Sequence, residues 1–404
     1  MLGAIIGDIV GSCFEFDNHR SKDFNLFVQD SRFTDDTVMT LAVAKAILSC
    51  NGNWDNLGEQ AVIWMRRIGR KYCYNDYGWN FRGWLRDDWK GPYESYGNGA
   101  AMRVSPCGFI ASTEDEAKLL SRKVTEVTHN HDEGIKGAEA TTVAIFMAKS
   151  GATKKEIRKQ IVHDYYSLNF TLDGIHETYQ FNETCQETVP QAIVAFLESI
   201  TFEDCIRNAI SIGGDSDTLA AIACAIAEAY YGIPRNLKEK ALSYVETEPE
   251  LFEIYREWVV HYPVIQEDHR IITKYIEKIR ADSLGEWIID RENDGTKDHP
   301  KHIPYVNYND IIKEFMAEFY RYSDAHLEYK LNCYSEILEQ NGLKWSDKEM
   351  RSADLQNLDA QGILALIMGV IRAERFNDGV LLSFLKDGSL TNWLIRLREI
   401  DRSM

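Results

Sequence analysis

Two clusters of carboxylates and hydroxyls are the residues of this chain most suited to chemistry. Each cluster holds two acids and at least one threonine. They are Thr34, Asp35, Asp36 and Thr37 in the first, and Asp215, Asp217 and Thr218 in the second. Carboxylate and hydroxyl oxygens are the ligands that hard divalent cations prefer. Neither cluster contains His or Cys, so the pattern favours Mg²⁺, Mn²⁺ or Ca²⁺ over zinc.

Both clusters stand where a helix is expected to begin, because apolar runs follow at Val38–Leu48 and Ala220–Tyr231. One acid at a helix N-terminus could be a simple cap, stabilised by free N–H groups and the helix dipole. Capping needs only one acid, however, and neighbouring ionised carboxylates repel each other unless a cation or hydrogen bonds compensate. Two such clusters in one chain could hold two metal ions between them.

A glycine-rich segment, Tyr96-Gly97-Asn98-Gly99, offers a second kind of chemistry. Gly-Asn-Gly is a turn signature, and a structural turn is the simpler interpretation. No alternating strand pattern flanks the segment, however, and a helical run follows it. A glycine-rich loop that enters a helix presents N–H groups that suit a phosphate. These residues alone leave both interpretations open.

A His-x-His pair, His129 and His131, precedes Asp132 and the small-residue helix expected at Gly134–Ala148. The chain offers no further His or Cys at a ligand spacing, so a zinc site is not favoured. We expect His129 to form hydrogen bonds instead, either to a substrate or as a helix cap.

The composition of the chain disfavours several classes of function. The chain has 404 residues and a formal net charge of −18, which disfavours nonspecific binding to nucleic acid or to an anionic membrane. An anionic substrate would need local compensation, which divalent cations can supply. The eight cysteines are scattered without zinc-like spacing, no basic secretory signal opens the chain, and no apolar run is long enough to span a membrane. We expect a cytoplasmic protein.

The secondary-structure elements that position these residues are expected to be helices. Gly3, Gly7 and Gly11 recur every fourth residue, which predicts a central helix whose glycine face lets another backbone approach closely. Further helices are expected at Thr188–Ser199 and Thr201–Ile212. No strand alternation is evident before about residue 280. The sequence therefore predicts an all-α fold.

Beyond the first region, the charged and turn-rich stretch Ile289–His302 is interpreted as an interdomain connector. Strong helical patterns follow at Asn309–Asn341 and Asp359–Arg375. We expect a catalytic domain at residues 1–285 and a smaller, mainly helical domain at residues 286–404.

The first region resembles the ADP-ribosylglycohydrolase family, which includes the dinitrogenase reductase-activating glycohydrolase and the eukaryotic ADP-ribosylhydrolases. The match runs from about residue 1 to about residue 262, and the order and spacing of its motifs are specific. The motifs are Gly3–Ser12 with Glu15, Phe33–Thr37, Tyr96–Arg103, Thr128-His129 and Gly213–Thr218. The region from about residue 285 resembles a bacterial domain of unknown function, with Ile371–Gly379 as its most recognisable run.

This resemblance implies an all-α fold whose site holds two Mg²⁺ or Mn²⁺ ions. The metal ligands that it implies are Thr34, Asp35, Asp36, Asp215, Asp217 and Thr218, with Glu15 near the metals. The substrate-binding residues that it implies are Ser95, Tyr96, Gly97, Asn98, Gly99 and His129. Some arginine-specific bacterial members carry an aspartate where this chain has Ser95, which leaves Glu15 or Asp36 as the catalytic base and leaves the linkage specificity open.

The implied activity is hydrolysis of the glycosidic bond between ADP-ribose and an acceptor, which reverses ADP-ribosylation. The partner would be an ADP-ribosylated protein or a small ADP-ribosyl conjugate, with nucleic acid expected only as a modified substrate. Two alternatives remain: a non-enzymatic member that binds ADP-ribose or serves structurally, and a hydrolase of a free small conjugate. Asp215-x-Asp217 also resembles aspartyl-phosphate phosphatases superficially, but the nucleophile of that family follows a buried strand, whereas a helix precedes this motif.

Overall fold

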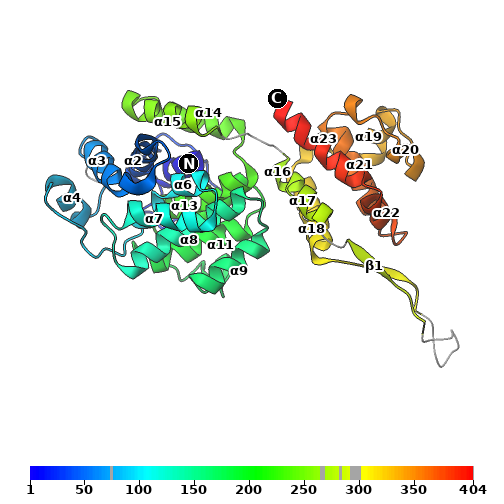
Figure 1. Ribbon diagram of the computed structural model, residues 1–404, viewed down its shortest axis with the longest axis horizontal. Coiled ribbons are helices and arrows are strands. Elements are labelled where there is room, and N and C mark those ends of the chain that lie inside the picture. The colour runs from blue at the N-terminus through cyan, green and yellow to red at the C-terminus, as the bar shows by residue number, and fades with distance from the viewer. Residues whose placement is uncertain (73–75, 264–268, 282–283, 292–301, 404) are drawn as a thin grey trace. The chain divides into compact units, whose positions relative to one another are not determined.

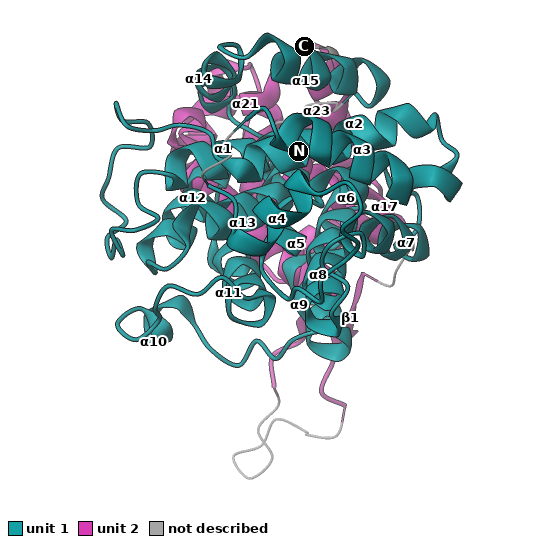
Figure 2. Ribbon diagram, turned by 90° about the vertical axis from the view of Figure 1, so that its left-hand side faces the viewer, with its two compact units in different colours: residues 1–264 teal, residues 265–404 magenta. Residues whose placement is uncertain are grey.

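The computed structural model describes residues 1–72, 76–263, 269–281, 284–291 and 302–403 of the chain (Figure 1). The chain divides into two compact units, residues 1–264 and residues 265–404, which Figure 2 shows in different colours. This division falls earlier than the boundary expected from the sequence. Both units are mainly helical, and the only two strands among the described residues are short. The expected all-α fold is confirmed.

Unit 1 consists of helices joined by loops and one short 3₁₀ turn. In chain order the helices are α1 (Leu2–Gly11), α2 (Asp35–Cys50), α3 (Leu57–Gly69), α4 (Trp79–Arg86), α5 (Gly99–Met102), α6 (Ser105–Ile110), α7 (Glu114–Thr125), α8 (Asp132–Lys149), α9 (Lys154–Asp164), α10 (Leu172–Ile175), α11 (Cys185–Glu198), α12 (Phe202–Ser211), α13 (Ser216–Tyr231), α14 (Arg235–Val245) and α15 (Pro249–His261). Each helix expected from the apolar runs is present, with its ends shifted by a few residues.

The centre of unit 1 is the pair α1 and α13. Every residue of α1 is buried, and α13 is buried from Ser216 to Tyr230. A Cβ on Gly3 would lie 2.2 Å from the Cys224 carbonyl oxygen, and one on Gly7 would lie 2.2 Å from the Ala220 oxygen. The expected glycine face is therefore confirmed, because no larger residue would let the two backbones come this close. This packing brings the C-terminal end of α1 and the start of α13 together.

Unit 2 begins with α16 (Arg270–Thr273) and α17 (Tyr275–Ala281), followed by the antiparallel strands β1 (Gly285–Ile288) and β2 (Tyr305–Tyr308). The register pairs Gly285 with Tyr308. The stretch Ile289–His302, of which residues 292–301 lie outside the described residues, connects these two strands. Its interpretation as an interdomain connector is wrong, because both strands belong to unit 2.

The remaining helices of unit 2 are α18 (Asp310–Ala325), α19 (Tyr334–Gln340), α20 (Asp347–Arg351), α21 (Ala360–Ala373), α22 (Val380–Lys386) and α23 (Ser389–Ser403). The helix expected at Asn309–Asn341 is interrupted after Ala325. Two 3₁₀ turns follow, and Lys330 between them has a left-handed backbone with φ +50°. The stretch Asn309–Asn341 therefore forms two α-helices, α18 and α19, rather than one.

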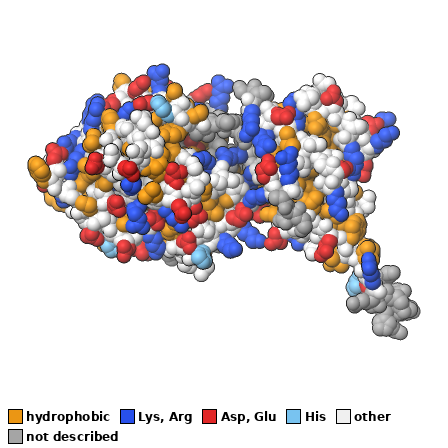
Figure 3. Space-filling view, viewed as in Figure 1, with side chains coloured by type: hydrophobic (Ala, Val, Ile, Leu, Met, Phe, Trp, Pro, Cys, Tyr) orange, Lys and Arg blue, Asp and Glu red, His pale blue; other side chains and the backbone are white. Residues whose placement is uncertain are grey.

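No helix among the described residues is both long and apolar enough to cross a membrane. On the face shown in Figure 3, basic and acidic side chains are interspersed over both units. The described cysteines are all free.

Candidate active site

A cleft of about 380 Å³ in unit 1 collects most of the residues singled out in the sequence. Those that line it are Glu15, Asp35, Asp36, Ser95, Gly97, Asn98, Gly99, His129, Asp215, Asp217 and Thr218. Thr34 and Tyr96 are not among the lining residues. Thr34 is buried beneath the cleft, whereas Tyr96 is 45% exposed with its ring 5.2 Å from that of His131.

The acids converge at the starts of α2 and α13. One carboxylate oxygen each from Glu15, Asp215 and Asp217 lies within 4.8 Å of the other two. Asp36 joins them through the hydroxyl of Thr218, which donates to its Oδ2 at 3.2 Å. The Oδ1 of Asp36 is buried and has no hydrogen-bond donor in the structure. A buried carboxylate oxygen without a donor is costly unless a cation compensates for its charge.

Burial and mutual repulsion raise the pKa of every acid in this cluster. Burial contributes most, followed by repulsion from Asp217, and together they raise the pKa of Glu15 to about 8. Burial also raises the pKa of Asp215 to about 7. The pKa values of Asp35, Asp36 and Asp217 are raised well above the ordinary value, by burial first and then by the neighbouring carboxylates. Without a cation, these groups cannot all be ionised together near neutral pH.

Residues outside the acid cluster hold the turn that precedes α13. Gly213 and Gly214 have φ of +67° and +77°, a backbone conformation that glycine adopts without strain. The Asn18 Oδ1 accepts the N–H of Gly214 at 3.2 Å. The guanidinium of Arg20 donates to the carbonyl oxygens of His176, Tyr179 and Ile212. These contacts hold the turn that presents Asp215, and no local sequence pattern predicts them.

Asp8 fixes the other acid-bearing segment. Its buried carboxylate accepts the N–H of Thr34 at 2.9 Å and the hydroxyl of Thr34 at 2.7 Å. It also accepts the N–H of Thr37 at 3.0 Å and the Thr37 hydroxyl. The Thr34 oxygen in turn accepts the N–H of Asp36 at 3.3 Å and caps α2. We infer that Asp8 sets the orientation of the Asp35-Asp36 pair.

The glycine-rich segment forms a turn that reaches back to the acids. The Asn98 side chain donates to Oδ2 of Asp215 at 2.6 Å. The N–H of Gly97 donates to Oγ of Ser95 at 3.2 Å, and the N–H of Asn98 donates to the Glu183 oxygen at 2.7 Å. Two of the loop N–H groups are thus used within the protein. The structure records no acceptor for the Gly99 N–H.

His129 presents one ring nitrogen to this loop. Burial, and then the Arg103 charge, hold its pKa well below 6.5, so the ring is neutral. Arg103 donates to Oγ1 of Thr128 at 2.6 Å, and that hydroxyl lies 2.8 Å from Nδ1 of His129. Since Nδ1 faces donors, the ring proton is placed on Nε2. A Cβ built on Gly99 would lie 3.4 Å from Nε2, so the absence of a side chain leaves room for the ring.

Several lining residues were not assigned a role from the sequence. Arg103 is 1% exposed, and its Nε has no acceptor in the structure. A charged residue at the end of the apolar run Ala100–Met102 was the available signal. The others include Asp76, Tyr77, Trp79, Phe81 and Tyr93. Most of them are aromatic, and only the fold places them at the cleft.

Comparison with known proteins identifies the families that the two parts of the chain match. Residues 1–264 match the family model described as ADP-ribosylglycohydrolase. Residues 264–403 match a family of unknown function, DUF6508. The chain is 27% identical to the ADP-ribosylarginine hydrolase Tri1 of Pseudomonas putida, over 58% of this chain and 70% of that protein.

Two further relatives carry related names. The human ADP-ribosylhydrolase ARH3 is 24% identical, over 61% of this chain and 89% of that protein. The ADP-ribosyl-[dinitrogen reductase] glycohydrolase of Rhodospirillum rubrum is 26% identical, over 57% of this chain and 84% of that protein.

Proposed function

Because this chain belongs to the ADP-ribosylglycohydrolase family and is a hydrolase of that kind, we propose that it cleaves the glycosidic bond between the anomeric carbon of ADP-ribose and an acceptor. The reaction would reverse ADP-ribosylation. The observation that carries the proposal is the cleft itself, in which a set of buried acids lies beside a glycine-rich turn and a neutral histidine.

The donor set fits two hard divalent cations, Mg²⁺ or Mn²⁺. The cluster consists of carboxylate and hydroxyl oxygens, and the Oδ1 of Asp36 is buried without a donor. The residues that would hold the ions are Thr34, Asp35, Asp36, Asp215, Asp217 and Thr218, with Glu15 beside them. Bound cations would orient the ribose hydroxyls and make a water more acidic. They would also relieve the repulsion among the acids.

The chain's own residues would bind and orient the substrate. The neutral His129 would offer its Nε2–H, and Gly99 its backbone N–H, to the phosphate or distal ribose oxygens. Arg103 lies behind the histidine and would add a positive charge on the diphosphate side. Ser95 shapes the turn by accepting the Gly97 N–H. These groups would offset the net charge of −18 where the anionic substrate binds.

The hydrolytic step needs a base and a proton donor. Water adds to the anomeric carbon as its bond to the acceptor breaks, and the departing nitrogen or oxygen receives a proton. Glu15 and Asp36 are the candidates for taking the proton of the water. Glu15 lies at the cleft with its pKa raised to about 8, so it can also carry a proton at neutral pH.

The test is a panel of substrates with full-length protein and Mg²⁺. The panel contains peptides ADP-ribosylated on arginine or on serine, an ADP-ribosylated oligonucleotide, and O-acetyl-ADP-ribose. We expect free ADP-ribose to be released from at least one of them. Asp217→Asn is the matched inactive variant, with activity reduced by orders of magnitude. If none of the substrates is cleaved although the protein binds ADP-ribose, the proposal is wrong.

A further inference from the structure

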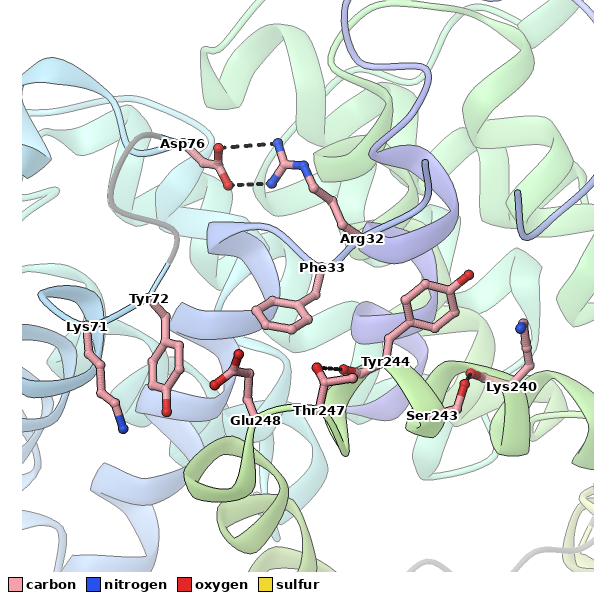
Figure 4. A pocket seen from close by; sticks show the side chains of 10 residues that line it. All are labelled: Arg32, Phe33, Lys71, Tyr72, Asp76, Lys240, Ser243, Tyr244, Thr247 and Glu248. Carbon is pink, nitrogen blue, oxygen red and sulfur yellow. Dashed lines mark hydrogen bonds and ion pairs between the residues drawn. The ribbon is translucent and has the colours of Figure 1, made fainter. Parts of the chain in front are cut away.

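A second and larger hollow opens beside the catalytic cleft in unit 1. It has a volume of about 700 Å³, and we call it the side groove. Its lining residues are Arg32, Phe33, Lys71, Tyr72, Asp76, Lys240, Ser243, Tyr244, Thr247 and Glu248, which Figure 4 shows. Asp76 lines both hollows. Phe33 directly precedes the Thr34–Asp36 segment, so the side groove and the acid cluster are neighbours along the chain as well.

Aromatic rings and an ion pair line the side groove. Phe33, Tyr72 and Tyr244 present their rings in Figure 4, and Tyr244 is stacked on Phe27 at 6.0 Å. Arg32 and Asp76 form an ion pair at 2.6 Å. Aromatic rings held in this way offer contact area at little cost in conformational entropy.

Two lining charges have no ion-pair partner within the described residues. The Lys240 ammonium lies 5.4 Å from the centre of the Tyr244 ring, and Glu248 extends from the start of α15. Ser243 and Thr247 are exposed between them along the chain. Their hydroxyls donate to the carbonyl oxygens of Lys240 and Tyr244, at 2.6 and 2.7 Å, and keep their lone pairs for a donor from outside. The groove thus offers one cation, one anion, hydroxyls and rings, a mixture that suits a polypeptide with its donors and acceptors.

This mixture does not suit a nucleic acid. A polyanionic strand is held by several cations that neutralise its phosphates. In the side groove, however, Lys71 is paired with Glu250 at 2.8 Å and Arg32 with Asp76. Only Lys240 among the lining cations lacks an acidic partner in the described structure. A polypeptide is therefore the occupant that the charges favour.

Asp76 joins the cleft to the side groove, because it lines both hollows. Its charge also acts on Glu15 and Asp35 in the acid cluster. Asn98 of the glycine-rich turn contacts Asp215 of the same cluster. If the diphosphate lies toward the turn and the anomeric carbon at the acids, the acceptor continues past Asp76. We propose that the side groove binds the polypeptide chain that carries the ADP-ribose, an inference that rests on the proposed function.

Kinetics test this proposal with a charge swap that preserves net charge. The variant is Lys240→Glu/Glu248→Lys, and the control is Lys159→Glu/Glu246→Lys, which reverses two charges outside both hollows. Full-length holoenzyme is assayed on mixed-sequence peptides that carry ADP-ribose on serine or arginine, and on a small ADP-ribosyl conjugate without a peptide. We expect the swap to raise KM for the peptides about tenfold, a typical effect of losing interface contacts. The small conjugate and the control should be unaffected.

Crosslinking provides a readout that does not need catalysis. A photoreactive group is placed on the residue next to the ADP-ribosylated one, and the labelled protein residue is identified by mass spectrometry. Labelling of Ser243, Tyr244 or Thr247 supports the groove even if the protein cleaves nothing, in which case only the proposed function fails. Labelling elsewhere, or an equal loss on both substrates in the swap, overturns the groove.

Discussion

The hydroxyl of Thr34 donates to the carboxylate of Asp8 at 2.7 Å, at the start of α2. Asp8 accepts this bond and three others, whereas the Oδ1 of Asp36 has no donor among the described residues. Two buried aspartates thus have opposite roles. One organises the start of α2, and we propose that the other binds a cation.

This contrast predicts opposite effects of the same substitution. Asp8→Asn removes an acceptor of hydrogen bonds, so we expect the free energy of unfolding to fall by about 1–3 kcal/mol. Asp36→Asn removes a repelling charge, so the stability of metal-free protein should stay level or rise while activity falls by orders of magnitude. Urea unfolding in EDTA measures both. A larger loss of stability in Asp36→Asn than in Asp8→Asn would contradict the assignment.

Arg20 is predicted to act on the proposed metal site without contacting a bound ion. Its planar guanidinium holds three carbonyl oxygens around the turn that presents Asp215. A lysine cannot serve all three, so Arg20→Lys should lower Mn²⁺ affinity about tenfold, as outer contacts of metal sites do. Arg207→Lys is the control, because Arg207 holds the Lys22 and Phe24 oxygens instead. Equal affinities in both variants would refute this role.

The buried, neutral His129 should make the free energy of unfolding depend on pH. Its pKa is held below 6.5 in the folded protein, first by burial and then by Arg103. Its contribution is fully present above about pH 6.5 and is lost as the pH falls from there toward the folded pKa, because only the unfolded chain takes up the proton. The loss is at most about 1.4 kcal/mol per pH unit. His129→Gln should remove this part of the slope, measured by urea unfolding between pH 7 and 5.

The exposed His261 supplies the control for this experiment, since His261→Gln should leave the wild-type slope intact. Parallel pH curves for wild type and His129→Gln would show that His129 does not remain neutral in the folded protein.

The two-unit division predicts that the chemistry resides in unit 1. Both hollows lie within residues 1–264, and α16 and α17 pack with α18 and α23 in unit 2. A chain ending at Pro263 should therefore fold and cleave a small ADP-ribosyl conjugate at a near-native rate. Circular dichroism establishes the folding, and ADP-ribose release measures the rate. A folded but inactive truncation would mean that unit 2 helps to build the site.

Much of the fold could be predicted because its signals are local. The glycines at positions 3, 7 and 11 mark a helix face, and the acid pairs at 35–36 and 215–217 mark two helix starts. These patterns need no knowledge of distant contacts. The break of the long helical pattern after Ala325 was missed, because Lys330 gives no local warning of its left-handed backbone.

The residues that complete the site could not be predicted for the opposite reason. Asp8, Arg20 and Asp76 act through partners distant in the sequence, such as the contact of Arg20 with Ile212. An isolated Asp or Arg in a sequence is most simply a solvated charge. Arg103 gave the only usable signal, as a charge following an apolar run, and its contact with Thr128 appears only in the fold.

We propose that the buried acids hold catalytic cations, and a metal titration distinguishes such a site from an inert cluster of acids. Metal-stripped full-length protein is titrated with Mn²⁺ by calorimetry, and ADP-ribose release is measured at each point. We predict two bound ions per chain, no hydrolysis without metal, and activity that returns as the sites fill. Full activity in the metal-stripped protein, or Mn²⁺ binding unchanged in Asp36→Asn, would contradict the account.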